Sequence, residues 1–231
     1  MKQRNEKELE FFGKITAGIT HEMKNVLAII KESAGLMEDI LSLSSEAPIP
    51  HQDKIQTSLT KIKTQIMRGV ELTNRLNRFA HSSDETPAKI DLHETAEQLI
   101  ALSQRFARLK NVVLKTGFPE KSDQPMALVT HPVQLQMALF LCIQCCLDVM
   151  PSGGEITISL EKKGAKIAIH NTCKGDLTGR IERVGMITSS ANWSELKEIS
   201  DYLQGTIEID EANAVVKLIL PEEINETPDS V

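Results

Sequence analysis

The hydrophobic pattern of the first 80 residues predicts two long amphipathic helices. Apolar residues in 7–44 recur at spacings of three and four, which places them on one helix face: Phe12, Ile15, Ile19, Met23, Val26, Ile30, Ala34, Met37 and Leu41. A second such stripe, in residues 52–82, consists of Ile55, Leu59, Ile62, Ile66, Val70, Thr73, Leu76 and Ala80. Proline cannot continue a helix interior, so Pro48 and Pro50 separate the two segments. The short connection predicts an antiparallel hairpin.

A single helical hairpin cannot bury both apolar stripes well. Two hairpins can, when they pack together as a four-helix bundle. The pattern therefore predicts a homodimer formed through residues 1–84.

After a linker at 82–87, the pattern changes to that of an α/β domain. Asp91 and Glu94 form a capping box for a helix over 92–109, and 111–117 is typical of a strand. A second helix is expected over 131–150, with Pro132 in its first turn.

The remaining residues predict a β-hairpin, a helix and two further strands. Segments 155–160 and 166–170 have strand character around the turn at 162–164. Asn192 and Glu195 predict the start of a helix that runs to Gln204, and Gly205 ends it. The last strands are expected at 206–210 and 214–220. Residues 88–222 should thus form an α/β domain with helices on one face of a mixed sheet, followed by a flexible tail at 223–231.

Composition narrows the function classes. The chain has 231 residues, 41% hydrophobic, with a formal net charge of −6. A negative charge argues against nucleic-acid binding, which favours a basic face. The longest apolar run, 137–143, is too short to span a bilayer, and the polar N-terminus does not resemble a signal peptide. We therefore expect a cytoplasmic protein that does not bind membranes.

Three of the four cysteines lie in one apolar segment. Cys142, Cys145 and Cys146 are spaced so that a helix scatters them around its axis, and they form no paired zinc motif. We interpret them as small buried hydrophobic residues in a reducing compartment. No metal site is predicted.

The most reactive cluster lies early in the first helix. His21, Glu22 and Asn25 stand within five residues, and His21 is not on the apolar stripe. Gly18 lies one turn before His21 and Asn25 one turn after it, and Ala28 continues the same line. The imidazole is flanked by small or short side chains, so a partner protein could reach it.

The segment Phe11–Asn25 strongly resembles the phosphoacceptor box of two-component histidine kinases, of the His-Glu-x-x-Asn type. Residues 77–80 and 90–94 resemble the junction between the dimerisation hairpin and the ATP-binding domain of that family. His131-Pro132-Val133-Gln134-Leu135 resembles the entry to the helix that carries its magnesium-binding asparagine, and 148–154 resembles the exit. The resemblance covers most of the chain and implies the histidine kinase ATP-binding fold for 88–222.

This resemblance implies roles for the residues of the box. His21 would be the phosphorylated residue, and Glu22 could hydrogen-bond the second ring nitrogen, fix the tautomer and raise nucleophilicity. Asn25 could orient a water molecule or a phosphoryl oxygen. Gly18 and Ala28 would lie where the partner docks.

The same resemblance indicates a degenerate nucleotide site. The family's metal-binding asparagine falls on Cys145, whose thiol is not the hard oxygen ligand that magnesium prefers. The adenine-binding aspartate falls on Asn171, and the first glycine of its motif falls on Cys173, two residues before Gly175. The second glycine motif and the lid are missing between Gly175 and the helix at Asn192. We therefore expect no ATP binding and no cofactor on this chain.

The sequence as a whole resembles bacterial phosphorelay proteins that keep the helical hairpin and carry a degenerate ATP-binding domain. The expected function is that of a dimeric histidine phosphotransferase, in which His21 moves a phosphoryl group between response-regulator receiver domains. Magnesium would be supplied by the receiver. Only about ten residues precede the box, and they contain no sensor or transmembrane segment, so we do not expect signal-driven autophosphorylation. A response-regulator phosphatase, an atypical sensor kinase and a non-catalytic dimeric adaptor remain as alternatives.

Overall fold

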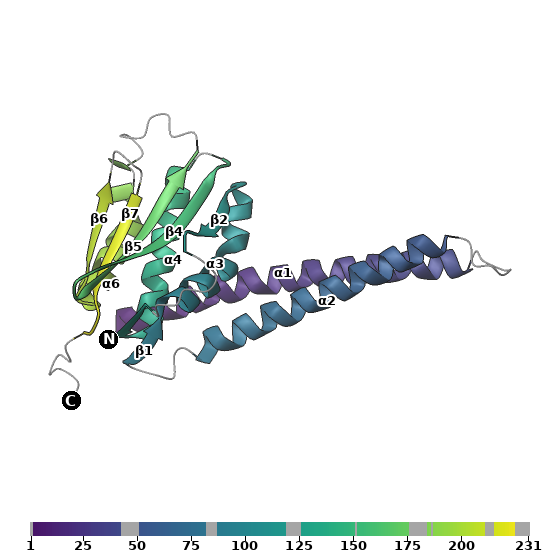
Figure 1. The fold of residues 1–231 in the computed structure, drawn as a ribbon, viewed down its shortest axis with the longest axis horizontal. Coiled ribbons are helices and arrows are strands. Elements are labelled where there is room, and N and C mark those ends of the chain that lie inside the picture. The colour runs from purple at the N-terminus through teal and green to yellow at the C-terminus, as the bar shows by residue number, and fades with distance from the viewer. Residues whose placement is uncertain are drawn as a thin grey trace. The chain divides into compact units, whose positions relative to one another are not determined.

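The chain forms two compact units. The computed structural model describes residues 2–42, 51–81, 87–118, 126–150, 152–175, 184–185, 187–210 and 215–224. One unit is Gly13–Ala80, and the other combines Met1–Phe12 with His81–Val231. The first turns of the long first helix thus belong with the α/β unit, whereas the sequence predicted one hairpin domain over residues 1–84. Figure 1 shows the elements of both units.

The unit Gly13–Ala80 consists of two helices that run side by side. Helix α1 spans Lys2–Ser42 and α2 spans Gln52–His81 (Figure 1), close to the predicted 7–44 and 52–82. Residues 43–50 and 82, on which the predicted break and the last residue of α2 fall, lie outside the described residues. The helices approach closely at Gly69, where an added Cβ would lie 3.4 Å from Val26 Cγ1.

The apolar stripe of α2 is not fully used within the hairpin. The fully buried residues of α2 are Ser58, Gly69 and Phe79. Ile66 and Val70, which belong to the predicted stripe, are 48% and 50% exposed. Part of the apolar face of α2 therefore remains open to solvent.

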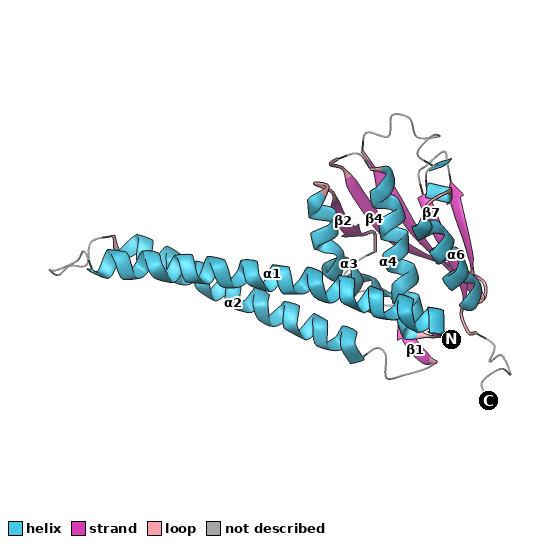
Figure 2. Ribbon diagram, turned by 180° about the vertical axis from the view of Figure 1, so that it is seen from behind, coloured by secondary structure: helices cyan, strands magenta, loops and turns pink. Residues whose placement is uncertain are grey.

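The α/β unit contains a five-stranded mixed sheet in the order β2-β4-β5-β7-β6. Its strands are β2 (Val113–Thr116), β4 (Glu155–Lys163), β5 (Lys166–Lys174), β6 (Thr206–Asp210) and β7 (Val215–Pro221). The pair β2–β4 is parallel and the other three pairs are antiparallel. Helices α3 (Leu92–Leu109), α4 (Pro132–Val149) and α6 (Ala191–Tyr202) cover one face of this sheet (Figure 2). This is the predicted mixed sheet with helices on one face.

Two short strands were not predicted. Strand β1 (Ala88–Asp91) pairs antiparallel with β3 (Ala127–Thr130) as a separate two-stranded sheet. Each strand has only four residues, which is too short for a clear alternating pattern. The predicted flexible tail at 223–231 begins too early, because Glu223 forms a bridge with Val129 and Ile224 is buried. Residues 225–231 lie outside the described part.

Helix boundaries follow from capping chemistry. Asp91 caps α3, since its carboxylate Oδ1 accepts hydrogen bonds from the amides of His93 (2.8 Å) and Glu94 (3.3 Å). The cap of α6 is Ser190, whose hydroxyl accepts from the amide of Trp193 at 3.1 Å. The predicted cap at Asn192 was therefore wrong by two residues, because Ser190 takes this role. Asn192 instead donates to the carboxylate of Asp148 at 2.9 Å.

Helix α4 is the centre of the α/β core. Among the described residues it alone is long and apolar enough to cross a membrane, but 89% of it is buried inside the protein. Its apolar character is therefore explained by packing between the sheet and its neighbouring helices. Phe140 on α4 packs against Phe106 of α3 with ring centroids 5.3 Å apart.

The start of α1 packs into this α/β core. Phe11 is 4% exposed, and its ring centroid lies 5.5 Å from that of Phe140. Glu8 Oε1 accepts a hydrogen bond of 2.7 Å from Gln134 Nε2. Lys7 forms an ion pair with Glu198 of α6. These contacts explain why residues before Gly13 belong to the α/β unit.

Candidate phosphoacceptor site

His21 is exposed on the middle of α1, as its position off the apolar stripe predicted. Its Nδ1 atom lies 3.4 Å from Nδ2 of Asn25, which is also exposed. Residues four apart on a helix face each other, so this contact follows from local geometry. The imidazole is therefore accessible from solvent, and one of its two nitrogens has a side-chain amide beside it.

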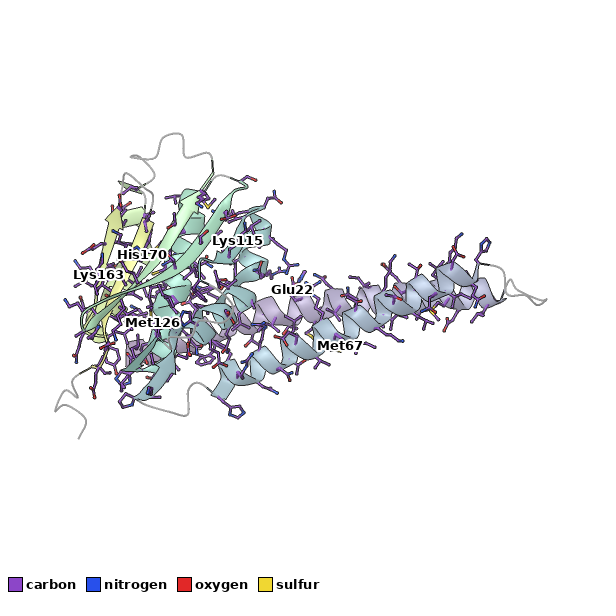
Figure 3. All side chains as sticks on the ribbon, in the orientation of Figure 1. Glu22, Met67, Lys115, Met126, Lys163 and His170 are labelled. Carbon is purple, nitrogen blue, oxygen red and sulfur yellow. The ribbon has the colours of Figure 1, made fainter. Side chains whose placement is uncertain are left out.

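Glu22 has a different partner from the one that the sequence suggested. The residue is only 7% exposed, and its Oε2 accepts a hydrogen bond of 2.9 Å from the guanidinium of Arg68 on α2. Burial of a carboxylate is costly unless it is paired. Glu22 therefore connects the two helices of the hairpin, and the described contact of the His21 ring is with Asn25. Figure 3 labels Glu22 on α1 and Met67, the neighbour of Arg68, on α2.

Arg68 is the residue of this site that the sequence analysis missed. It stands 46 residues from Glu22, and the side chain of Arg68 is 42% exposed. An isolated arginine on a helix is ordinarily a solvated side chain, so nothing in the local pattern singled it out.

The predicted docking residues differ in exposure. Asn25 and Ala28 are exposed like His21, whereas Gly18 is buried. The surface beside the imidazole that a partner can contact therefore includes Asn25 and Ala28 and does not include Gly18.

The positions that the sequence resemblance aligned with nucleotide contacts are filled with core residues. Cys145 of α4 is buried, and burial, with a smaller effect from Asp148, raises its pKa to about 12. Burial, and then Cys145, also raise the pKa of Cys142. For Cys146, a hydrogen bond with Cys173 raises the pKa more than burial does. At neutral pH these buried thiols are therefore protonated.

Asn171 is also part of the core. It is fully buried on β5, and its Nδ2 donates to the carbonyl oxygen of Val216 at 3.3 Å. The backbone carbonyl oxygen of Asn171 accepts a hydrogen bond from the Cys146 thiol at 3.6 Å. Asn171 Oδ1 is buried without a hydrogen-bond partner among the described residues. The side-chain NH2 group of Asn171 therefore donates to the neighbouring strand β7.

Gly175 has a structural contact of its own. A Cβ added at Gly175 would lie 3.3 Å from the Cα of Gly154, so the end of β5 rests against the turn that precedes β4. Gly154 has φ +95°, and a Cβ there would lie 2.3 Å from the carbonyl oxygen of Lys174. This close approach by itself explains why residue 154 is a glycine, and phosphate binding is not needed as an explanation. The second glycine motif was sought over 176–191, and within that segment residues 176–183 and 186 lie outside the described residues.

An apolar groove runs along the hairpin and includes Met23, two residues after His21. Its volume is about 340 Å³, and its lining consists of Met23, Val26, Leu27, Ile30, Ile66, Gly69, Val70, Thr73 and Asn74. Leu27, Ile66 and Val70 are each about half exposed. Within the described ranges, no cluster of three histidine, cysteine or carboxylate side chains is suited to hold a metal ion.

Comparison with known proteins gives similarities in structure alone. No protein-family model and no curated protein matches the chain. A histidine kinase from Burkholderia phymatum is 14% identical, with a TM-score of 0.49 over 87% of this chain and 99% of that one. The histidine kinase ThkA, in a complex with the response regulator protein TrrA, is 17% identical, with a TM-score of 0.46 over 100% of this chain and 66% of that one. A bacterial phosphotransferase is 12% identical, with a TM-score of 0.47 over 91% and 95%.

Proposed function

We propose that this protein is a dimeric histidine phosphotransferase of a two-component phosphorelay. His21 accepts a phosphoryl group from the aspartyl phosphate of one response-regulator receiver domain and passes it to the aspartate of another. The observation that carries the proposal is the exposed imidazole of His21, held on a helical hairpin within a box that resembles the histidine kinase phosphoacceptor segment.

Accessibility of His21 is the first requirement for this reaction. Phosphoryl transfer depends on in-line positioning and on stabilisation of charge. The acceptor nitrogen must reach within about 3–3.5 Å of phosphorus, which is the separation of reacting atoms in a near-attack geometry. An imidazole on the outside of a helix, next to the short side chains of Asn25 and Ala28, allows a receiver to approach that closely.

The α/β unit supports a role without ATP. Cys145 offers a neutral thiol at the metal-binding position, and the amide of Asn171 donates to Val216. Each contact that is lost from a buried polar group costs about 1–3 kcal/mol. The combined loss removes most of the useful nucleotide affinity. The magnesium needed for transfer would then be held by the receiver, and the α/β unit would serve partner docking.

The groove on the hairpin supports the homodimer. Exposed apolar side chains on both helices (Leu27 on α1, Ile66 and Val70 on α2) form one continuous lining. A second copy of the same hairpin would cover it and complete a four-helix bundle. No nucleic acid or membrane is required by this function, and all its steps suit the cytoplasm.

Incubation with radiolabelled, phosphorylated receiver domains tests the proposal. Label should appear on the wild-type chain and should be lost in His21→Gln, because glutamine has no nucleophilic ring nitrogen. His81→Gln is the matched control, since His81 is also exposed at the end of a hairpin helix. That variant should be labelled like the wild type, and ATP with magnesium should label none of the three proteins.

Other outcomes would contradict the proposal in distinct ways. Equal labelling of His21→Gln would place the acceptor elsewhere. Loss of phosphate from the receiver without any label on His21 would indicate a phosphatase. Labelling by ATP alone would indicate an autokinase.

A further inference from the structure

The contact between His21 and Asn25 bears on which nitrogen of the ring reacts. Nδ1 is bonded to the ring carbon nearest the backbone and lies 3.4 Å from the Asn25 amide. Nε2 is at the far edge of the ring on an exposed residue. An incoming phosphorus atom can therefore reach Nε2 more readily than Nδ1.

Attack by Nε2 requires one particular tautomer of the neutral ring. The nitrogen that attacks must carry a lone pair, so the proton must be on Nδ1. The hydrogen bond made by one ring nitrogen decides which nitrogen is protonated. A partner that accepts a hydrogen bond from Nδ1–H would prepare Nε2 for the reaction.

Asn25 can provide that acceptor. Its amide carries an oxygen and a nitrogen of almost equal size, and rotation by half a turn exchanges their places. With Nδ2 toward the ring, as in the structure, Nδ1 accepts the hydrogen bond and Nε2 holds the proton. With Oδ1 toward the ring, Nδ1–H donates and Nε2 has its lone pair free. The same position of Asn25 thus permits both tautomers, and only the second is reactive at Nε2.

Glu22, the residue expected from the sequence to set the tautomer, instead pairs with a residue of the other helix. Its Oε2 accepts a hydrogen bond of 2.9 Å from Arg68, and its side chain is 9% exposed. A nearly buried carboxylate needs a partner of opposite charge. The Arg68 guanidinium supplies it to Glu22 from the other helix of the hairpin. The geometry therefore separates the two roles between two residues.

We propose that Asn25 is a positioning residue for His21: its Oδ1 accepts from Nδ1–H and leaves Nε2 as the phosphoacceptor atom, while Glu22 pairs with Arg68. This inference rests on the proposed function for its chemistry. During transfer, the Nε2 lone pair forms the new P–N bond. The P–O bond to the receiver aspartate breaks, and its electron pair remains on the aspartate carboxylate.

The hydrogen bond to Asn25 should strengthen during the reaction. Nδ1 keeps its proton while Nε2 becomes bonded to phosphorus, so positive charge develops on the ring. Hydrogen bonds to a charged partner are stronger than those between neutral groups. Asn25 would therefore stabilise the transition state more than the ground state, which is the condition for acceleration.

The direct test is nitrogen NMR of the His21 ring in the free protein, where the two tautomers have distinct signals. The wild type should be mainly Nδ1–H. Asn25→Asp keeps an acceptor and should keep this tautomer. Asn25→Leu has a similar size without an acceptor and should shift the ring toward Nε2–H. Transfer to Asn25→Leu should fall about three- to tenfold, as expected for one hydrogen bond.

Glu22→Gln is the control for the separation of roles. It should leave the His21 tautomer unchanged, because the pairing with Arg68 does not set it. An Nε2–H ring in the wild type, or an unchanged tautomer in Asn25→Leu, would overturn the assignment of Asn25. An Nδ1–H ring that depends on Asn25 in a protein that never accepts phosphate would support the assignment and refute the proposed function.

Discussion

At the scale of single residues, the hairpin presents an exposed imidazole at His21 next to a nearly buried carboxylate, Glu22, that pairs with Arg68. The position of His21 off the apolar stripe predicted an accessible imidazole, and the structure confirms it. Spacing along one helix likewise placed Asn25 next to His21. The pairing of Glu22 with Arg68 could not be predicted, because it depends on which turns of α1 and α2 meet.

The Glu22–Arg68 pair should contribute measurably to the stability of the hairpin. A double-mutant cycle with Glu22→Ala and Arg68→Ala should give a coupling free energy of about 1 kcal/mol, because one partner is nearly buried. The measurement is the free energy of unfolding of the four proteins in urea.

A matched pair on the same hairpin provides the control. Arg75 and Glu71 form an ion pair of 2.7 Å within one helix, and the side chain of Glu71 is 53% exposed. Their coupling should be only about 0.3–0.5 kcal/mol, as for other helix pairs four residues apart. A Glu22–Arg68 coupling at or below this value would show that the pair does not hold the helices together.

At the scale of elements, periodicity identified most helices and strands. The long stripes predicted α1 and α2, and the apolar run with Pro132 predicted α4. The four-residue strands β1 and β3 were missed because their pairing is set by residues far away in the chain. The cap of α6 was misplaced because Ser190 and Asn192 are both good capping residues, and only the backbone course selects Ser190.

The turn before β4 offers a test of close backbone packing. Gly153 and Gly154 both have positive φ, at +78° and +95°, but only Gly154 is crowded, by the carbonyl oxygen of Lys174 and by Met150. Alanine at either position pays about 1–2 kcal/mol for the left-handed conformation. Gly154→Ala should cost at least about 2 kcal/mol more, since the added Cβ overpacks this contact.

Thermal or urea unfolding of the two alanine variants measures this difference. Gly153→Ala serves as the control, because nothing lies within 4 Å of the added Cβ. Equal loss of stability in both variants would mean that the approach of β5 to this turn is not tight in solution.

At the scale of the whole molecule, the sequence predicted two units but not their boundary. The change of hydrophobic pattern placed the boundary in the linker after α2. In the structure, Phe11 packs against Phe140, so the start of α1 belongs to the α/β unit. A continuous helical pattern gives no sign that its two ends belong to different cores. Ile19, which belongs to the predicted apolar stripe of 7–44, is 2% exposed in the single chain. A charge at Ile19 would therefore destabilise the fold itself.

Association is best tested at a position that is exposed in the single chain and lines the groove. Ile66 meets both conditions, being 48% exposed. In the proposed dimer, Ile66→Glu would bury an unpaired carboxylate, which costs about 3 kcal/mol or more and weakens association at least about 100-fold. Sedimentation should therefore show a wild-type dimer and an Ile66→Glu monomer with unchanged helix content.

Met67 supplies the matched control for this substitution. It is the next residue of α2 and is 69% exposed, but it does not line the groove (Figure 3 labels it). Met67→Glu introduces the same charge one position along, on a different side of the helix, and should leave the dimer intact. Dissociation by both variants would point to a general effect of charge on α2. A wild-type chain that sediments as a monomer at micromolar concentration would contradict the dimer outright, because two exposed hairpin faces would then remain uncovered in solution.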